Sequence, residues 1–158
     1  MKPILVGLGG RGRYWLGQCN QQQGVEVTAC VEPFAQNRQR AIANHEIAAD
    51  QIYDDLGQAL EATEADFVLD ITPPTVHEEI AMQTFAAGLH LLGEKPLSDD
   101  YQAAQRVVAA GQQAGVKHMT TQNYRFAGLP RTTRRLLAED TAVDQFESAA
   151  REIEKALG

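Results

Sequence analysis

The chain has 158 residues, of which 44% are hydrophobic and 6% aromatic, a composition typical of a folded domain and not of a disordered or fibrous protein. Its net charge of −7 argues against a nucleic-acid or anionic-membrane surface, because such surfaces need concentrated positive charge. Two cysteines and no Cys/His cluster with ligand spacing predict neither a disulfide framework nor a metal site. No apolar stretch approaches the roughly 20 residues of a membrane span, so we expect a cytoplasmic protein that binds no membrane.

Short apolar runs alternate along the chain with longer segments rich in Ala, Gln, Glu and Arg. The runs cover residues 3–8, 25–31, 66–72, 89–94 and 117–122, and Ile52 and Tyr53 fit a sixth, very short strand. Strands that alternate with helices in this way form βαβ units and a parallel sheet. Because the runs are apolar almost throughout, we expect helices on both faces. The sequence thus predicts an α/β fold with a doubly wound parallel sheet.

The remaining segments have helical patterns. Residues 99–116 give the clearest one, with Ser98 as the expected N-cap, acidic residues directly after it and a glycine near the end. The last part of the chain has no strand signal and predicts two amphipathic helices that meet near Asp140. We therefore expect a sheet domain over residues 1–126 and a C-terminal helical segment over residues 127–158.

The loop after the first apolar run reads VGLGGRG and spaces its glycines in a way that points to a phosphate site. Gly7 permits a tight turn, Gly9 lets backbone approach a pyrophosphate, and Gly12 lets the next helix pack closely on the strand. That helix, with Gly10 and Arg11 in the same loop, directs free N–H groups and its positive dipole end at the phosphates. The pattern predicts a Rossmann dinucleotide-binding fold, although similar loops also bind S-adenosylmethionine.

An acidic residue in the expected place supports a dinucleotide. Glu32 stands twenty positions after Gly12, at the end of the second run, where a carboxylate accepts hydrogen bonds from the adenosine ribose hydroxyls. This favours NAD as the cofactor. NADP stays open because Arg38 or Arg13 could swing toward a 2′-phosphate, and a solvated loop glutamate is the simpler alternative for Glu32.

Three stretches together give the sequence a family resemblance. VGLGGRG, TPPTVHEEIAMQTFAAGLHLLGEKPLS and TQNYRF resemble the N-terminal half of the glucose-fructose oxidoreductase, inositol dehydrogenase and MocA family. The resemblance covers roughly residues 1–126. The Glu-Lys-Pro motif, at this interval after Thr-Pro-Pro, is far more specific than the glycine loop alone.

The resemblance assigns chemistry to the Glu-Lys-Pro motif. In that family the lysine of the motif, here Lys95, lies between nicotinamide and substrate, positions the reacting hydroxyl and shares in proton transfer. A lysine desolvated beside a bound cofactor suits a general acid or base. By the same resemblance Glu94 contacts the ribose side of the cofactor, and Pro96 fixes the backbone that holds the pair. We therefore expect Lys95 to be catalytic.

The resemblance also implies further contacts to the cofactor. Those expected to line the dinucleotide are Thr72, Pro73, Pro74 and His77, and those expected to face the nicotinamide or substrate side are Asn123 and Arg125. Two simpler alternatives stay open, a helix-start residue without a ligand role for His77 and a surface ion-pair partner for Arg125. For Tyr14 and Trp15 in the first helix, core packing is expected for at least one.

Members of that family continue into a second sheet domain that supplies most substrate contacts and a further catalytic histidine. We expect this chain to lack that domain and to be an isolated cofactor half. The sequence predicts an NAD(P)-dependent oxidoreductase that moves hydride between nicotinamide and a secondary alcohol of a sugar, cyclitol or related small molecule. The alternative is a non-catalytic dinucleotide-binding module. A methyltransferase ranks third because it has no use for a Glu-Lys-Pro motif.

The expected tail helices carry an apolar stripe. Its members recur at near-helical spacing: Leu136, Leu137, Val143, Phe146, Ala150, Ile153 and Leu157. A cofactor half without its second domain would leave an apolar face bare. We expect the tail helices to cover that face or to form a homodimer, and the chain alone to bind nucleotide without turning over sugar substrates. A solvated tail is the alternative.

Overall fold

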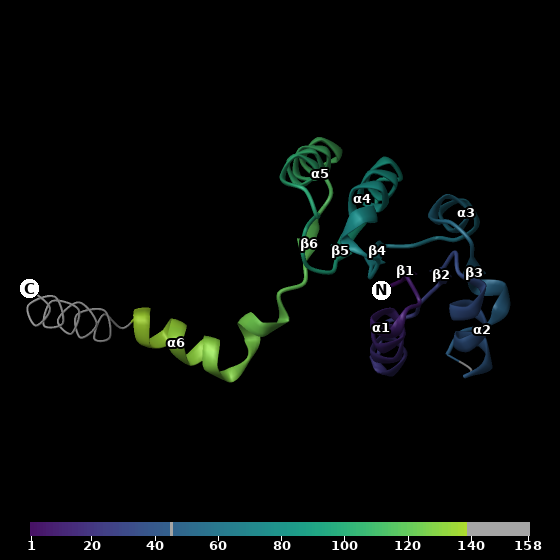
Figure 1. Ribbon diagram of the computed structural model, residues 1–158, viewed down its shortest axis with the longest axis horizontal. Helices are drawn as coiled ribbons and strands as arrows, with labels where there is room; N and C mark the ends of the chain where they lie inside the picture. The colour runs from purple at the N-terminus through teal and green to yellow at the C-terminus, as the bar shows by residue number, and fades with distance from the viewer. Residues whose placement is uncertain (45, 139–158) are drawn as a thin grey trace, which may run out of the picture. The chain divides into compact units, whose positions relative to one another are not determined.

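The computed structural model describes residues 1–44 and 46–138, which belong to two compact units (Figure 1). The first unit is Met1–Thr121, and the second begins at Gln122. The described part of the second unit consists of a 3₁₀ turn, η3 (Asn123–Phe126), and a helix, α6 (Gly128–Ala138). The first of the two expected tail helices is thus confirmed. The second, beyond Asp140, lies outside the described residues, and the functional division at residue 126 stays a prediction.

The first unit is built on a parallel sheet of six strands. The strands are β1 (Pro3–Val6), β2 (Ala29–Val31), β3 (Ile52–Tyr53), β4 (Phe67–Asp70), β5 (His90–Gly93) and β6 (His118–Thr120). Their order in the sheet is β3-β2-β1-β4-β5-β6. Val6 pairs with Val31 on one side and with Asp70 on the other, so the chain reverses its direction of winding between β1 and β4. The short third strand and the parallel pairing confirm the sequence prediction.

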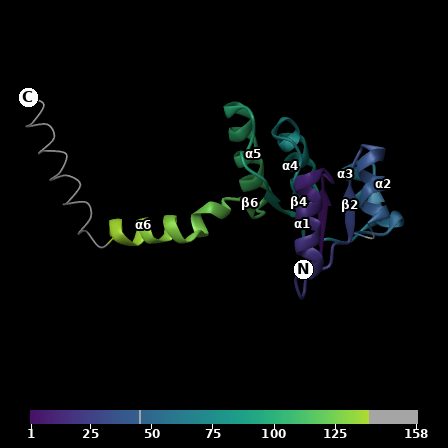
Figure 2. The same ribbon diagram turned by 60° about the horizontal axis from the view of Figure 1, so that its bottom comes forward.

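Helices cover both faces of the sheet. They are α1 (Gly10–Gln21), α2 (Ala35–Ala43), α3 (Leu56–Ala62), α4 (His77–Ala86) and α5 (Tyr101–Ala114), with 3₁₀ turns at η1 (Ala49–Gln51) and η2 (Pro74–Val76). Figure 1 shows α1 and α2 on one face and α3, α4 and α5 on the other. Helices α4 and α5 lie side by side in Figure 2 as well. The expected doubly wound α/β fold is therefore confirmed.

The alternation of side chains along each strand divides the core into two layers. Ile4 and Val6 of β1 pack with Ile80 of α4 on the face of α3, α4 and α5. Leu5, between them in sequence, packs with Leu16 of α1 on the opposite face. All four residues of β1 are buried. The two packed layers hold β1 and its loop rigidly at the centre of the sheet.

The start of α5 differs from the sequence prediction. Asp100 is the N-cap, because its Oδ2 accepts a hydrogen bond of 2.8 Å from the backbone N–H of Ala103. The Ser98 hydroxyl instead lies 3.4 Å from the backbone nitrogen of Asp100. The prediction that Ser98 caps this helix is therefore wrong. Serine and aspartate both cap helices well, and only the path of the backbone selects Asp100. The helix ends as expected at a glycine, Gly115, with a φ of 67°.

Candidate functional site

The predicted site residues follow four neighbouring strands at one edge of the sheet. Gly7 follows β1, Glu32 follows β2, Thr72 lies two residues after β4, and Glu94 follows β5. Two backbone hydrogen bonds of 2.8 Å continue the sheet into these loops. Gly7 N–H donates to the carbonyl oxygen of Val31, and Glu94 N–H donates to the carbonyl oxygen of the last residue of β4. The edge thus gathers the carboxyl ends of strands where the winding reverses, which is where open α/β sheets bind ligands.

The glycine loop has two crowded members and two open ones. Gly7 adopts a φ of 96°, and a Cβ on Gly12 would lie 1.8 Å from the carbonyl oxygen of Gly7. No atom would lie within 4 Å of a Cβ on Gly9 or Gly10. Gly9 is the N-cap of α1, so the first-turn N–H groups of that helix face outward beside bare backbone. The open side of the loop can take a phosphate group.

Glu32 lies buried between two loops. Its Oε2 accepts a hydrogen bond of 2.8 Å from Leu8 N–H in the glycine loop, and its Oε1 accepts one of 2.9 Å from Phe34 N–H. The residue is 3% exposed, so the alternative of a solvated loop glutamate is wrong. Each carboxylate oxygen keeps a second acceptor position for a hydroxyl group. The arrangement fits the predicted contact to an adenosine ribose.

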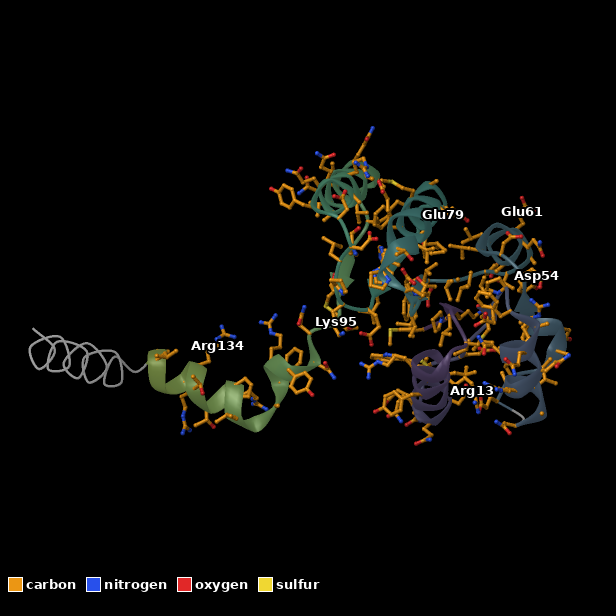
Figure 3. All side chains as sticks on the ribbon, viewed as in Figure 1. Arg13, Asp54, Glu61, Glu79, Lys95 and Arg134 are labelled. Carbon is orange, nitrogen blue, oxygen red and sulfur yellow. The ribbon has the colours of Figure 1, made fainter. Side chains whose placement is uncertain are left out.

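The two arginines considered for a 2′-phosphate already have partners. Arg38 Nη1 donates to the carbonyl oxygens of Glu32 over 2.8 Å and Pro33 over 2.9 Å, and lies 2.7 Å from Asp54 Oδ1. Arg13 forms a two-point ion pair with Glu46, one bond of which, from Nε to Oε2, measures 2.8 Å. That carboxylate raises the pKa of Arg13. Arg13 and Asp54 are labelled in Figure 3.

Four donors converge on the buried carboxylate of Glu94. Arg11 Nε and Trp15 Nε1 donate to Oε1 over 2.7 and 2.9 Å, while the Thr121 hydroxyl and Lys95 N–H donate to Oε2 over 3.1 and 3.2 Å. Burial raises the pKa of Glu94, but the hydrogen bonds from Trp15, Arg11 and Thr121 outweigh it and hold the pKa below its ordinary value. Glu94 is therefore an ionised, fully engaged anchor, and its expected contact to the cofactor stays a prediction.

Sequence reasoning missed Trp15 and Thr121 as members of this site. Trp15 does pack against the core, as expected, while Tyr14 is 58% exposed. The spacing of Arg11 and Trp15, four residues apart, puts both on one face of α1 and was the only local signal. No sequence pattern within α1 or β5 indicates that this face of α1 contacts Glu94.

Lys95 extends from the loop that follows β5 (Figure 3). The side chain is exposed, and its ammonium group has no hydrogen bond or ion pair to any residue in the described part of the chain. The peptide bond between Lys95 and Pro96 is cis. Because the Lys95 N–H is bound to Glu94 while the side chain is free, the residue offers a cation from a fixed backbone.

Asp70 and His77 hold the Thr-Pro-Pro loop through contacts to Thr72. Asp70 Oδ1 accepts hydrogen bonds from Thr72 N–H over 3.0 Å and from the Thr72 hydroxyl over 2.5 Å. Pro73 is exposed and Pro74 begins η2. His77 is 4% exposed, and both of its ring nitrogens lie against backbone carbonyls. The expected place of His77 in the lining of the dinucleotide stays a prediction.

Asn123 and Arg125 belong to the second compact unit. They lie in η3 and are exposed, and the Arg125 guanidinium lies 5.4 Å from the ring centroid of Phe126. Their expected place on the nicotinamide or substrate side stays a prediction.

Two further properties concern the described part of the chain as a whole. Within it, no three His, Cys, Asp or Glu side chains gather in a way that could hold a metal ion. None of its helices is long and apolar enough to cross a membrane.

Three features together define a Rossmann dinucleotide-binding domain. They are an outward-facing glycine loop between β1 and α1, a buried acidic residue after β2, and an edge of the sheet where the winding reverses. Residues 1–122 match the family model for the oxidoreductase family with an NAD-binding Rossmann fold. The chain therefore belongs to the Gfo/Idh/MocA oxidoreductase family and contains its NAD-binding domain.

Two of the relatives found are dehydrogenases. An inositol 2-dehydrogenase of Klebsiella pneumoniae is 30% identical over 116 residues, 73% of this chain and 34% of that protein. A 4-carboxy-2-hydroxymuconate-6-semialdehyde dehydrogenase of Sphingobium is 29% identical over 126 residues, 80% of this chain and 39% of that protein. This chain thus spans between 34% and 39% of the length of these two relatives.

A solved structure shares the fold. The WlbA dehydrogenase from Bordetella pertussis, in complex with NADH and UDP-GlcNAcA, matches with a TM-score of 0.80 and 22% identity, over 88% of this chain and 40% of that one. At this identity the likeness shows the fold alone.

Proposed function

We propose that this chain is the cofactor half of an oxidoreductase that moves a hydride between nicotinamide and a secondary alcohol carbon of a sugar, cyclitol or related small molecule. The observation that carries the proposal is Lys95, an exposed cation on a fixed backbone at the ligand edge of an NAD-binding domain. The name of one relative, inositol 2-dehydrogenase, supports this substrate class.

The residues present suit an NAD molecule at this edge. The open backbone at Gly9 and Gly10 leaves space that any side chain there would fill, next to the free N–H groups of α1. Gly7, Gly12 and Arg11 shape that loop, and we assign it to the pyrophosphate. When bound, the nicotinamide accepts or gives the hydride.

Further contacts extend the site on both sides of the pyrophosphate. We assign Glu32 to the adenosine ribose and Thr72, Pro73 and Pro74 to the wall of the dinucleotide pocket. Asn123 and Arg125 complete the proposed nicotinamide and substrate side.

Lys95 supplies the proton chemistry in this proposal. When an alcohol is oxidised, the carbon loses a hydride with its electron pair, the hydroxyl loses a proton, and the carbonyl double bond forms. The neutral amine of Lys95 accepts that proton, and in the reverse direction its ammonium returns it. Glu94 holds the backbone N–H of Lys95 and so keeps the side chain at the ligand edge.

We propose NAD as the cofactor in preference to NADP. Arg38 and Arg13 are held by Asp54 and Glu46, and the buried carboxylate of Glu32 would repel a 2′-phosphate. We also place the protein in the cytoplasm, where the free thiols of Cys19 and Cys30 stay reduced.

Calorimetric titrations with NADH, NADPH and S-adenosylmethionine test the cofactor assignment. We expect NADH to bind most tightly, NADPH more weakly and S-adenosylmethionine not at all. Glu32→Ser is expected to shift the preference toward NADPH, because the repelling carboxylate is gone. Failure of the folded protein to bind NADH, or an unchanged ratio in Glu32→Ser, would contradict the respective assignment.

The proposed chemistry is tested with the chain joined to a substrate domain. There Lys95→Ala is expected to lower turnover by orders of magnitude while NADH affinity changes little. Near-normal turnover would remove Lys95 from the catalytic role. NADH binding without hydride transfer to any polyol, even with a substrate domain present, would favour the alternative of a non-catalytic dinucleotide-binding module.

A further inference from the structure

One buried side chain connects the two loops that end at the proposed reaction centre. The ring of His77 places Nε2 2.9 Å from the carbonyl oxygen of Thr72, and Nδ1 2.9 Å from the carbonyl oxygen of Pro96. The first carbonyl belongs to the Thr-Pro-Pro loop and the second to the Glu-Lys-Pro loop. His77 is thus a direct bridge between the loop after β4 and the loop after β5.

The bridge is sealed from solvent. His77 begins α4 and is 4% exposed. It borders a cavity of about 10 Å³, room for about one water molecule, together with Asp70, Glu94 and His118. Burial raises the pKa of Asp70, an effect partly offset by hydrogen bonds from Thr72. Burial lowers the pKa of His118, and the two carboxylates on the cavity belong to Asp70 and Glu94.

The bridge fixes the backbone on the C-terminal side of Lys95. On the N-terminal side, the Lys95 N–H is held by Glu94 Oε2 at 3.2 Å. One residue further, the Pro96 carbonyl oxygen lies against His77 Nδ1 at 2.9 Å. A side chain whose backbone is held on both sides has few directions in which to extend, which is what a reacting group needs.

We propose that His77 is a positioning residue: it ties the Glu-Lys-Pro loop to the Thr-Pro-Pro loop and so sets where the Lys95 side chain meets nicotinamide and substrate. The inference rests on the proposed function for its chemical meaning, while the tie between the loops stands on the geometry alone. Carbonyl oxygens only accept hydrogen bonds, so the ring must supply the hydrogens. A neutral imidazole supplies one, and a doubly protonated ring supplies both.

Amide hydrogen exchange on the 158-residue chain tests the tie without any need for turnover. The reporters are the N–H groups of Thr72 and Lys95, each of which donates to a carboxylate. His77→Gln keeps a donor for one carbonyl, and His77→Leu keeps none. We expect exchange at both reporters to rise in both variants, by about tenfold or more in His77→Leu and by less in His77→Gln.

His118→Gln is the matched control, since it alters a histidine on the same cavity that has no hydrogen bond to either loop among the described residues. Exchange at Thr72 and Lys95 is expected to stay as in the parent chain. Thermal melts identify which variants are folded. If His77→Leu does not fold, the comparison of His77→Gln with the parent chain still tests the proposal. Unchanged exchange in a folded His77 variant overturns the proposal.

Kinetics of the chain joined to a substrate domain separate positioning from mere stability. We expect His77→Gln to lower kcat by about tenfold with KM for the dinucleotide nearly unchanged. Faster exchange with an unchanged kcat would overturn the positioning role. If Lys95→Ala also leaves kcat unchanged, the proposed function fails instead, and the exchange data still decide whether His77 ties the loops.

Discussion

The glycines of the loop after β1 differ in what constrains them. Gly12 has no room for a side chain, because a Cβ would overlap the Gly7 carbonyl at 1.8 Å. Gly9 has ample room on the protein side, where a Cβ would meet nothing within 4 Å. Packing therefore explains Gly12 but not Gly9. The space beside Gly9 is the space that the proposed pyrophosphate occupies.

This contrast gives a paired prediction. Gly9→Val is expected to lower NADH affinity by about a hundredfold or more while the folding stability changes by only about 1 kcal/mol. Gly12→Ala is expected to cost about 3 kcal/mol of stability, because the methyl group must displace backbone. Calorimetry with NADH and urea denaturation measure the two effects. Undiminished NADH binding by Gly9→Val would place the pyrophosphate elsewhere.

Glu94 makes a prediction about pH. Its pKa in the folded protein lies below the ordinary value, so its ionised form stabilises the fold above the unfolded-state pKa of about 4.3. That contribution is lost as the pH falls through the lowered pKa. We expect Glu94→Gln to cost about 2 kcal/mol at pH 7 and much less near pH 3.

Thermal melts of both proteins across this pH range provide the check. Glu61→Gln is the control, since Glu61 is exposed and has no side-chain partner in the described part of the chain. It should change little at any pH. A stability loss in Glu94→Gln that stays constant down to pH 3 would show that the shape of the side chain, and not its charge, stabilises the fold here.

Among the elements, those defined by local pattern were the most predictable. The apolar runs identified the strands, including the two-residue Ile52–Tyr53, and the spacing from Gly12 located the acidic Glu32 directly after β2. The bond from Trp15 to Glu94 joins residues 79 positions apart, and no periodicity within α1 or β5 encodes it. Such contacts depend on how the helices pack against the sheet.

The cap of α5 supplies a prediction at the scale of an element. Asp100→Ala is expected to cost about 1 kcal/mol of stability, because the N–H of Ala103 loses its acceptor. Asp100→Asn keeps an acceptor oxygen and should restore most of the loss. Ser98→Ala should change the stability little. A larger loss of stability in Ser98→Ala than in Asp100→Ala would show that Ser98 is the N-cap. Urea denaturation resolves differences of this size.

At the scale of the whole molecule, the tail remains the main open prediction. Of the members of the apolar stripe, Leu137 is 50% exposed. The members of the stripe from Val143 onward lie outside the described residues. We still expect the tail to cover apolar surface of the sheet domain or to join two copies of the chain.

Deletion of the residues after Asp140 tests that expectation. If the tail covers the sheet domain, the melting temperature falls, and if it joins two chains, the mass from light scattering falls from dimer to monomer. Unchanged melting together with an unchanged monomeric mass would show a solvated tail. Oxidation of a polyol by the intact 158-residue chain would show that no second domain is required.

The anchor at Glu94 has a consequence for how the domain unfolds. The sheet consists of two three-stranded halves that meet at β1 and β4, and Arg11 and Trp15 of the first half reach across to Glu94 of the second. Because neither half can unfold without breaking this partly buried link, we expect the two halves to denature in one cooperative transition. Trp15 is the only tryptophan in the chain, so its fluorescence, which arises in the first half, also reports the melting of the second.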